Sequence, residues 1–157
     1  MEPTRWKMFR GTYEHTVDEK GRVSVPIRFR EFLQATNDDR VVITNFKIGS
    51  TPCLDVYPHA IWAQLEEQLR VKPQFGAKIL SFVTYYVGNA AECEIDKQGR
   101  ILLPPTLREY AMLKKDVVFT SALTKFRIWD REHWKQVFDG AAEQVTQHPE
   151  LLEELGI

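Results

Sequence analysis

One ten-residue pattern occurs twice in this chain, and its repetition limits what the chain can fold into. The first copy, over residues 17–26, reads Val-Asp-Glu-Lys-Gly-Arg-Val-Ser-Val-Pro; the second, over residues 95–104, reads Ile-Asp-Lys-Gln-Gly-Arg-Ile-Leu-Leu-Pro. A constant offset of 78 residues carries Asp18 to Asp96 and Arg22 to Arg100. Self-similarity of this kind indicates a duplicated structural unit.

Each copy is predicted to form a β-hairpin that leads into a short helix. Glycine three residues after aspartate suits a three-residue loop with glycine in the left-handed region. The proline that closes each copy is favoured at the start of a helix and is not tolerated inside a central strand. We therefore expect hairpins formed by residues 9–18 with 22–25 and by residues 87–96 with 100–103, and helices over 27–33 and 106–112.

The later segments repeat the plan of two strands and a helix. Strands are predicted over 41–44, 53–57, 116–122 and 125–129, with a loop over 45–52. Helices are predicted over 58–70, from Pro73 onward, and from Arg131 onward, where Asp130 is expected to cap the helix. We expect an α+β fold in which two tandem repeats share one β-barrel-like core with short helices about an internal pseudo-two-fold axis, because neither half alone can bury much apolar surface.

This plan predicts five regions. They are an N-terminal extension (1–8), a first repeat (9–72), a connecting helix (73–86), a second repeat (87–138) and a C-terminal helical tail (139–157).

The charge of the chain is segregated. The formal net charge of −1 is unusual for a DNA-binding domain. However, residues 5–30 carry seven bases against three acids, whereas residues 143–157 carry four acids and neither lysine nor arginine. One face can therefore be basic while another is acidic. The absence of long apolar runs and of paired cysteines favours a cytoplasmic protein in which Cys53 and Cys93 are free thiols.

The two turns carry residue types suited to DNA contact. One copy alone would be interpreted as a turn-stabilising surface ion pair, but reuse of the same polar turn in both halves favours DNA contact. Glycine permits a tight turn that brings backbone N–H groups close to a phosphate, arginine offers a fork for guanine or phosphate, and lysine anchors the DNA backbone. The aspartates are expected to orient the turns by pairing with turn N–H groups or with the arginine. The predicted DNA-binding residues are Lys20, Gly21, Arg22, Lys97, Gly99 and Arg100, with Asp18 and Asp96 as turn-orienting residues.

Other polar and aromatic residues are given structural roles. Arg30 and Arg108 are expected to pair with nearby acids rather than reach DNA. The tryptophans at 62, 129 and 134 are interpreted as core or subunit-contact residues. The four histidines show no metal-ligand spacing and no partnered nucleophile, and no cofactor is implied.

With these turns, the proline-initiated helices and Phe9-Arg10-Gly11 near its start, the chain resembles the bacterial MraZ family, which carries two tandem repeats of the SpoVT-AbrB type. The resemblance covers residues 8–138. It implies a nucleoid-associated transcription regulator that is not an enzyme. It also implies ring-shaped homo-oligomers that bind direct repeats in double-stranded DNA upstream of the cell-division and cell-wall genes.

Two other functions remain as alternatives. Asp18 and Asp96 are related by the offset and are candidates for an acid–base dyad, although an arginine four residues after each would hold it ionised. A purely architectural ring, with the acidic tail or the tryptophan-bearing helices as its partner surface, is the second alternative. Loss of binding at high salt distinguishes DNA recognition from that ring.

Overall fold

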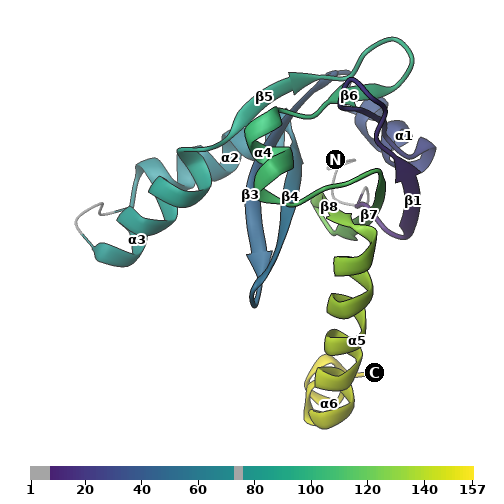
Figure 1. The fold of residues 1–157 in the computed structure, drawn as a ribbon. Coiled ribbons are helices and arrows are strands. Elements are labelled where there is room, and N and C mark those ends of the chain that lie inside the picture. Colours follow the sequence, from purple (N-terminus) through teal and green to yellow (C-terminus); the bar gives the residue numbers. More distant parts are fainter. Residues whose placement is uncertain (1–7, 73–75) are drawn as a thin grey trace.

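The computed structural model describes residues 8–72 and 76–157. The first half contains β1 (Thr12–Thr16), β2 (Arg22–Ser24), α1 (Ile27–Ala35), β3 (Arg40–Ile48), β4 (Thr51–Pro58) and α2 (His59–Arg70) (Figure 1). The second half contains α3 (Ala77–Phe82), a π-helical turn η2 (Val83–Val87), β5 (Ala91–Glu94), β6 (Arg100–Leu102), α4 (Pro105–Tyr110), β7 (Asp116–Ala122), β8 (Lys125–Asp130), α5 (Arg131–Gln147) and α6 (Glu150–Leu155).

The fold is α+β, with an antiparallel six-stranded sheet in the order β1-β7-β8-β4-β3-β5. The two halves of the chain exchange strands within this sheet. β1 of the first half pairs with β7 of the second, and β5 of the second half pairs with β3 of the first. β2 and β6 form a separate two-stranded ribbon. The pairings of the described residues leave β1 and β5 as the edges of the sheet, so the expected barrel-like core is not confirmed.

The two predicted hairpins are wrong as strand pairings. β1 and β2 contact each other only at the turn, where an isolated bridge joins Val17 to Val23, and each strand then pairs with the other half. The physical reason is that the two short strands have the same apolar pattern. Val23 and Ile101 face one another across the ribbon and are both buried, so β2 finds an equivalent partner in β6.

Most of the remaining elements are confirmed. Helix α2 ends at Arg70, and Asp130 caps α5 by accepting a hydrogen bond from the backbone N–H of Glu132. The predicted loop over 45–52 is wrong, because β3 continues to Ile48 and meets β4 through a tight turn at Gly49, which has φ of +61°. Residues 1–7 of the predicted extension over 1–8 and the predicted helix start at Pro73 lie outside the described residues.

Two apolar clusters lie on opposite faces of the six-stranded sheet. The larger joins the β2–β6 ribbon and helices α1 and α4 to one face and includes Phe29, Leu107 and Phe126. The smaller packs α2 and η2 on the other face around Trp62 and Tyr86. Fully burying side chains of this size contributes about 1.5–3 kcal/mol each, so these clusters hold the ribbon firmly against the sheet.

A buried polar network joins the two halves at the centre of the sheet. Asp55 on β4 lies directly opposite Arg127 on β8, and its Oδ1 accepts a hydrogen bond from Arg127 Nε at 2.8 Å. Its Oδ2 accepts from the hydroxyl of Tyr86, which also bonds the hydroxyl of Tyr57 at 2.6 Å. Burial, followed by the nearby Asp55 charge, raises the pKa of Tyr86, so Tyr86 stays protonated and able to donate.

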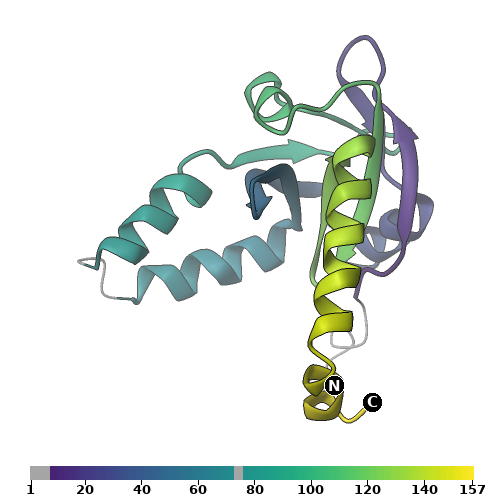
Figure 2. The ribbon, with the colours of Figure 1, turned by 60° about the horizontal axis from the view of Figure 1, so that its bottom comes forward.

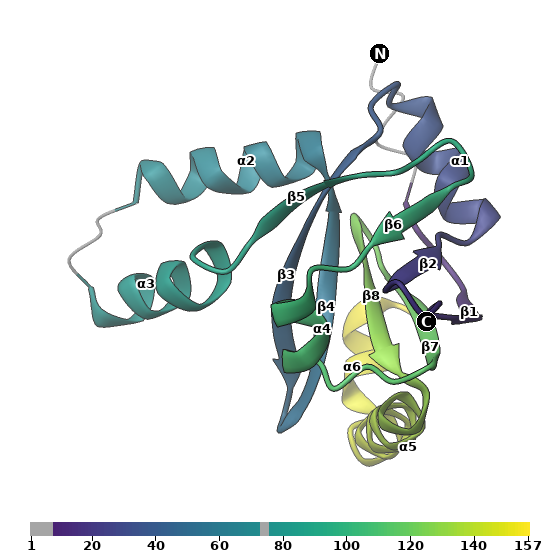
Figure 3. The ribbon, with the colours of Figure 1, turned by 45° about the horizontal axis from the view of Figure 1, so that its top comes forward.

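Two helical arms extend from this body. Helices α2 and α3 lie side by side as one arm (Figure 3), and α5 continues into α6 as the second (Figures 1 and 2). Among the described residues, none of the helices is both long enough and apolar enough to span a bilayer.

Candidate nucleic-acid interface

The β2–β6 ribbon places Arg22 and Arg100 on the same face. The register pairs Arg22 with Leu102 and Ser24 with Arg100, and directly opposed residues point to the same side of an antiparallel pair. Val23 and Ile101 point to the other side and are buried. The two arginines are therefore diagonal neighbours, about 7–8 Å apart at the backbone. Their side chains are 31% and 28% exposed, so the ribbon presents both to solvent.

The turn before β2 is held by Asp18. The backbone N–H of Asp18 donates to the carbonyl of Arg22 at 2.8 Å, and that of Gly21 donates to the carbonyl of Asp18 at 3.0 Å. The Asp18 carboxylate accepts three more hydrogen bonds, from the backbone N–H groups of Lys20 and Arg22 and from Arg22 Nε. Gly21 has φ of +85°, which only glycine adopts readily.

The turn before β6 repeats this geometry around Asp96. Its carboxylate accepts from the backbone N–H groups of Gln98 and Arg100 at 2.9 Å each and from Arg100 Nε at 3.1 Å. Gly99 has φ of +78°. The predicted turn-orienting contacts of both aspartates are present.

The arginines keep their outer nitrogens available. In both turns the carboxylate binds Nε, and within the described part of the chain the terminal nitrogens of Arg22 and Arg100 have no hydrogen-bond partner. The aspartate thus fixes the direction of the side chain while the outer edge of the guanidinium stays free to bind a base or a phosphate.

Backbone hydrogen bonds, above all from the N–H of the following arginine, lower the pKa of both Asp18 and Asp96. A carboxylate with a depressed folded pKa contributes stability above its unfolded pKa and loses it only as pH falls through the folded value. Both turns therefore stay intact at neutral pH. The same result counts against an acid–base dyad, which needs one carboxyl group with a raised pKa.

Each turn is anchored by the opposite half of the chain. The carbonyl of Gly21 accepts from the backbone N–H of Leu103, and that of Gly99 accepts from Val25, each at 2.9 Å. Arg108 lies against Gly21, and Arg30 lies against Gly99. The prediction that Arg30 and Arg108 pair with acids is wrong: the described residues give neither an ion-pair partner. Arg30 and Arg108 are 78 residues apart, which is the offset of the repeat, so the sequence already indicated that they occupy equivalent positions.

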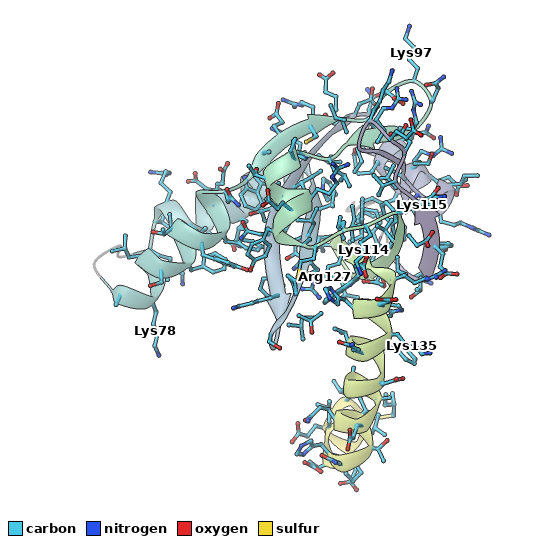
Figure 4. The ribbon with its side chains drawn as sticks, viewed as in Figure 1. Lys78, Lys97, Lys114, Lys115, Arg127 and Lys135 are labelled. Carbon is cyan, nitrogen blue, oxygen red and sulfur yellow. The ribbon has the colours of Figure 1, made fainter. Side chains whose placement is uncertain are left out.

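Gly21 and Gly99 form the tight part of each turn. Both are buried, and their N–H groups donate within the turn at 3.0 Å. These two N–H groups are thus used to close the turns. Lys20 and Lys97 are exposed, and Lys97 points away from the body from the tip of its loop (Figure 4).

Gly99→Ala is expected to destabilise the protein more than Gly21→Ala. Both changes place a side chain in the left-handed region at a cost of about 1–2 kcal/mol. A Cβ on residue 99 also lies 2.0 Å from Nη1 and 2.6 Å from Cδ of Arg30, whereas one on residue 21 lies 2.9 Å from Arg108 Nη1. Urea unfolding measures both losses.

Two further variants test this cause. Gly140→Ala is the control, because a Cβ there meets nothing within 4 Å in the middle of α5, and helix propensity predicts a gain of up to about 1 kcal/mol. Adding Arg30→Ala to Gly99→Ala removes the clash and should recover part of the loss. If Gly99→Ala and Gly140→Ala are equally stable, the strain and the clash with Arg30 expected at residue 99 are contradicted.

Burial raises the pKa of the Cys53 thiol, which lies in the sheet and is unreactive there. Within residues 8–72 and 76–157, histidine, cysteine and carboxylate side chains form no group of three or more suited to a metal ion.

Comparison with known proteins gives matches over nearly the whole chain. The family model described as "MraZ protein, putative antitoxin-like" matches residues 8–77 and 86–153. Proteins named "Transcriptional regulator MraZ" are similar over almost their full lengths. The one from Moorella thermoacetica is 42% identical over 150 residues, covering 96% of this chain and all of the relative. The one from Desulfitobacterium hafniense is 43% identical over 150 residues, with the same coverage. The one from Desulforamulus reducens is 42% identical over 148 residues, covering 94% and 99%.

Proposed function

The chain belongs to the MraZ family, and from this membership and the geometry of its two turns we propose that it is a sequence-specific DNA-binding transcription regulator. The observation that carries the proposal is the placement of Arg22 and Arg100 on one exposed face of the ribbon, each aimed by its own aspartate. The arginines read base edges, and Lys20 and Lys97 hold the phosphate backbone. Gly21 and Gly99 shape the turns, which Asp18 and Asp96 orient.

The architecture supports a pair of equivalent DNA-binding elements. We propose that residues 9–72 and 87–138 are two SpoVT-AbrB-like repeats related by a pseudo-two-fold axis, joined by residues 73–86 and followed by a tail over 139–157. The strand order reads the same from either edge when the halves are exchanged, and the ribbon pairs the two copies in a symmetric register. A DNA site made of two similar half-sites, each contacted by one repeat, fits such a surface.

We propose that the protein acts on the nucleoid in the cytoplasm as a ring-shaped homo-oligomer. Two arginine-bearing turns supply only about 1–3 kcal/mol of discrimination each, so one chain binds weakly. A ring that engages direct repeats upstream of the cell-division and cell-wall genes adds affinity through avidity. It also accommodates the net charge of −1, because only the rim that carries the turns must be basic.

The arm formed by α5 and α6 supports a contact between copies of this chain. It carries a series of exposed apolar side chains and extends from the body (Figure 2). Large apolar side chains left exposed together on one element are a feature of interaction surfaces. Its members are Phe138, Val145, Leu151, Leu152, Leu155 and Ile157.

The double variant Val145→Glu with Leu152→Glu is expected to lower the oligomer's mass by at least one subunit step while leaving the fold unchanged. Burying a carboxylate in an apolar contact is costly, and both positions are exposed in the single chain. Sedimentation velocity measures the mass, and Gln144→Glu adds a charge to the same arm without removing apolar surface. An unchanged mass for the double variant counts against the arm as the subunit contact.

The direct test of the function is retardation of a DNA fragment that carries the direct repeats, measured over a range of salt concentrations. Phosphate contacts by lysine and arginine make the logarithm of the binding constant fall linearly with the logarithm of the salt concentration. Binding that is insensitive to salt, or equal for a fragment without the repeats, favours the architectural ring instead.

A further inference from the structure

The two turns differ in the residue that lies next to them on the neighbouring strand. The backbone N–H of Val17, just before the first turn, donates to the carbonyl of Lys115 at 2.8 Å. The backbone N–H of Ile95, just before the second turn, donates to the carbonyl of Asp39 at 2.9 Å. These hydrogen bonds are equivalent in the two halves. The same structural position thus carries a positive charge beside one turn and a negative charge beside the other.

These two charges are not neutralised by ion pairs. Lys115 and Asp39 are exposed, and within the described ranges neither forms an ion pair. Their chain neighbours do: Lys114 Nζ lies 3.6 Å from a Glu132 oxygen, and Asp38 is bonded by Arg40 at 2.9 Å.

The flanking charges change which of the two turns is the more positive. The five residues of the first turn carry no net charge, and those of the second carry one positive charge. Once the flanking residues are included, the first turn has one positive charge and the second has none.

Both flanking residues lie beside their turns. Neighbouring strands lie about 4.8 Å apart, and Val17 and Ile95 immediately precede the turns. Charges within about 8 Å are only partly screened at physiological salt. Lys115 also lines a surface hollow with Asp18 and Glu19, and Asp39 lines one with Asp96 and Lys97.

We propose that Lys115 contacts the DNA backbone beside the first turn and that Asp39 repels it beside the second, which makes the first turn the stronger DNA-binding element. This inference rests on the proposed function. It adds two residues, one beside each turn, that make the two turns differ in their affinity for DNA. The geometry of the arginines is the same in both turns, so the difference in affinity arises from the flanking strand.

The test compares Lys115→Gln and Asp39→Asn with Lys78→Gln, a change on the α3 arm far from the turns (Figure 4). Lys115→Gln should weaken binding to repeat-bearing DNA by at least about threefold and reduce the salt slope by roughly one. Asp39→Asn should strengthen binding, and Lys78→Gln should leave it unchanged. All three positions are exposed, and circular dichroism confirms that each variant is folded.

Each outcome decides the inference. Equal effects of Lys115→Gln and Lys78→Gln, or weaker binding by Asp39→Asn, overturn it, and if wild-type binding still depends on salt, the proposed function stands. Wild-type protein that retards no DNA overturns both.

Discussion

Arg127→Met is expected to lower the free energy of unfolding by about 3–5 kcal/mol, the largest stability effect among the substitutions considered. The change removes the charged partner of Asp55, whose side chain is 1% exposed at the junction between the two halves. An unpaired buried carboxylate pays its desolvation cost without compensation. Urea denaturation followed by circular dichroism measures the loss.

The double variant Asp55→Leu with Arg127→Met is the matched control. Replacing both members of a buried ion pair by apolar residues is often neutral or stabilising, so the double variant should be more stable than Arg127→Met alone. The hydroxyl of Tyr86 keeps its hydrogen bond to Tyr57 in that variant. If Arg127→Met unfolds at the wild-type urea concentration, the pair does not join the halves as described.

Arg22→Ala is expected to abolish specific DNA binding, and Arg100→Ala to weaken it less, with the oligomer's mass unchanged. Losing one good base contact costs about 1–3 kcal/mol per site, and each subunit of the proposed ring would lose its contact at once. Both side chains are about a third exposed and lie outside the apolar clusters, so the fold is retained.

The variant Arg22→Lys separates charge from shape. Lysine keeps the positive charge but lacks the planar fork, so non-specific binding should persist while preference for the repeats is lost. Gel retardation with repeat-bearing and scrambled fragments gives both quantities. Full specificity in Arg22→Lys shows that the fork does not read bases.

The turns were predictable from sequence because their causes are local. Aspartate four residues before arginine, with glycine between them, specifies a turn within five residues, and the structure gives the expected hydrogen bonds in both copies. Asp130 was predictable as a helix cap for the same reason: its partner is two residues away.

Strand partners were not predictable because they depend on competition between equivalent segments. Residues 22–24 and 100–102 have nearly the same pattern, and nothing local shows that they pair with each other rather than with the strand before their own turn. The contacts of Arg30 and Arg108 with the opposite turns follow from that exchange. The opposite charges of Lys115 and Asp39 could not be related to the turns from sequence, because only the fold places both residues beside them.

The most direct test of the central claim, that two aligned arginines on one ribbon read DNA, is competition between repeat-bearing and scrambled DNA for wild-type protein and for the double variant Arg22→Ala with Arg100→Ala. The account predicts a strong preference for the repeats in the wild type and none in the double variant, at equal oligomer mass. A double variant that retains the wild-type preference contradicts it.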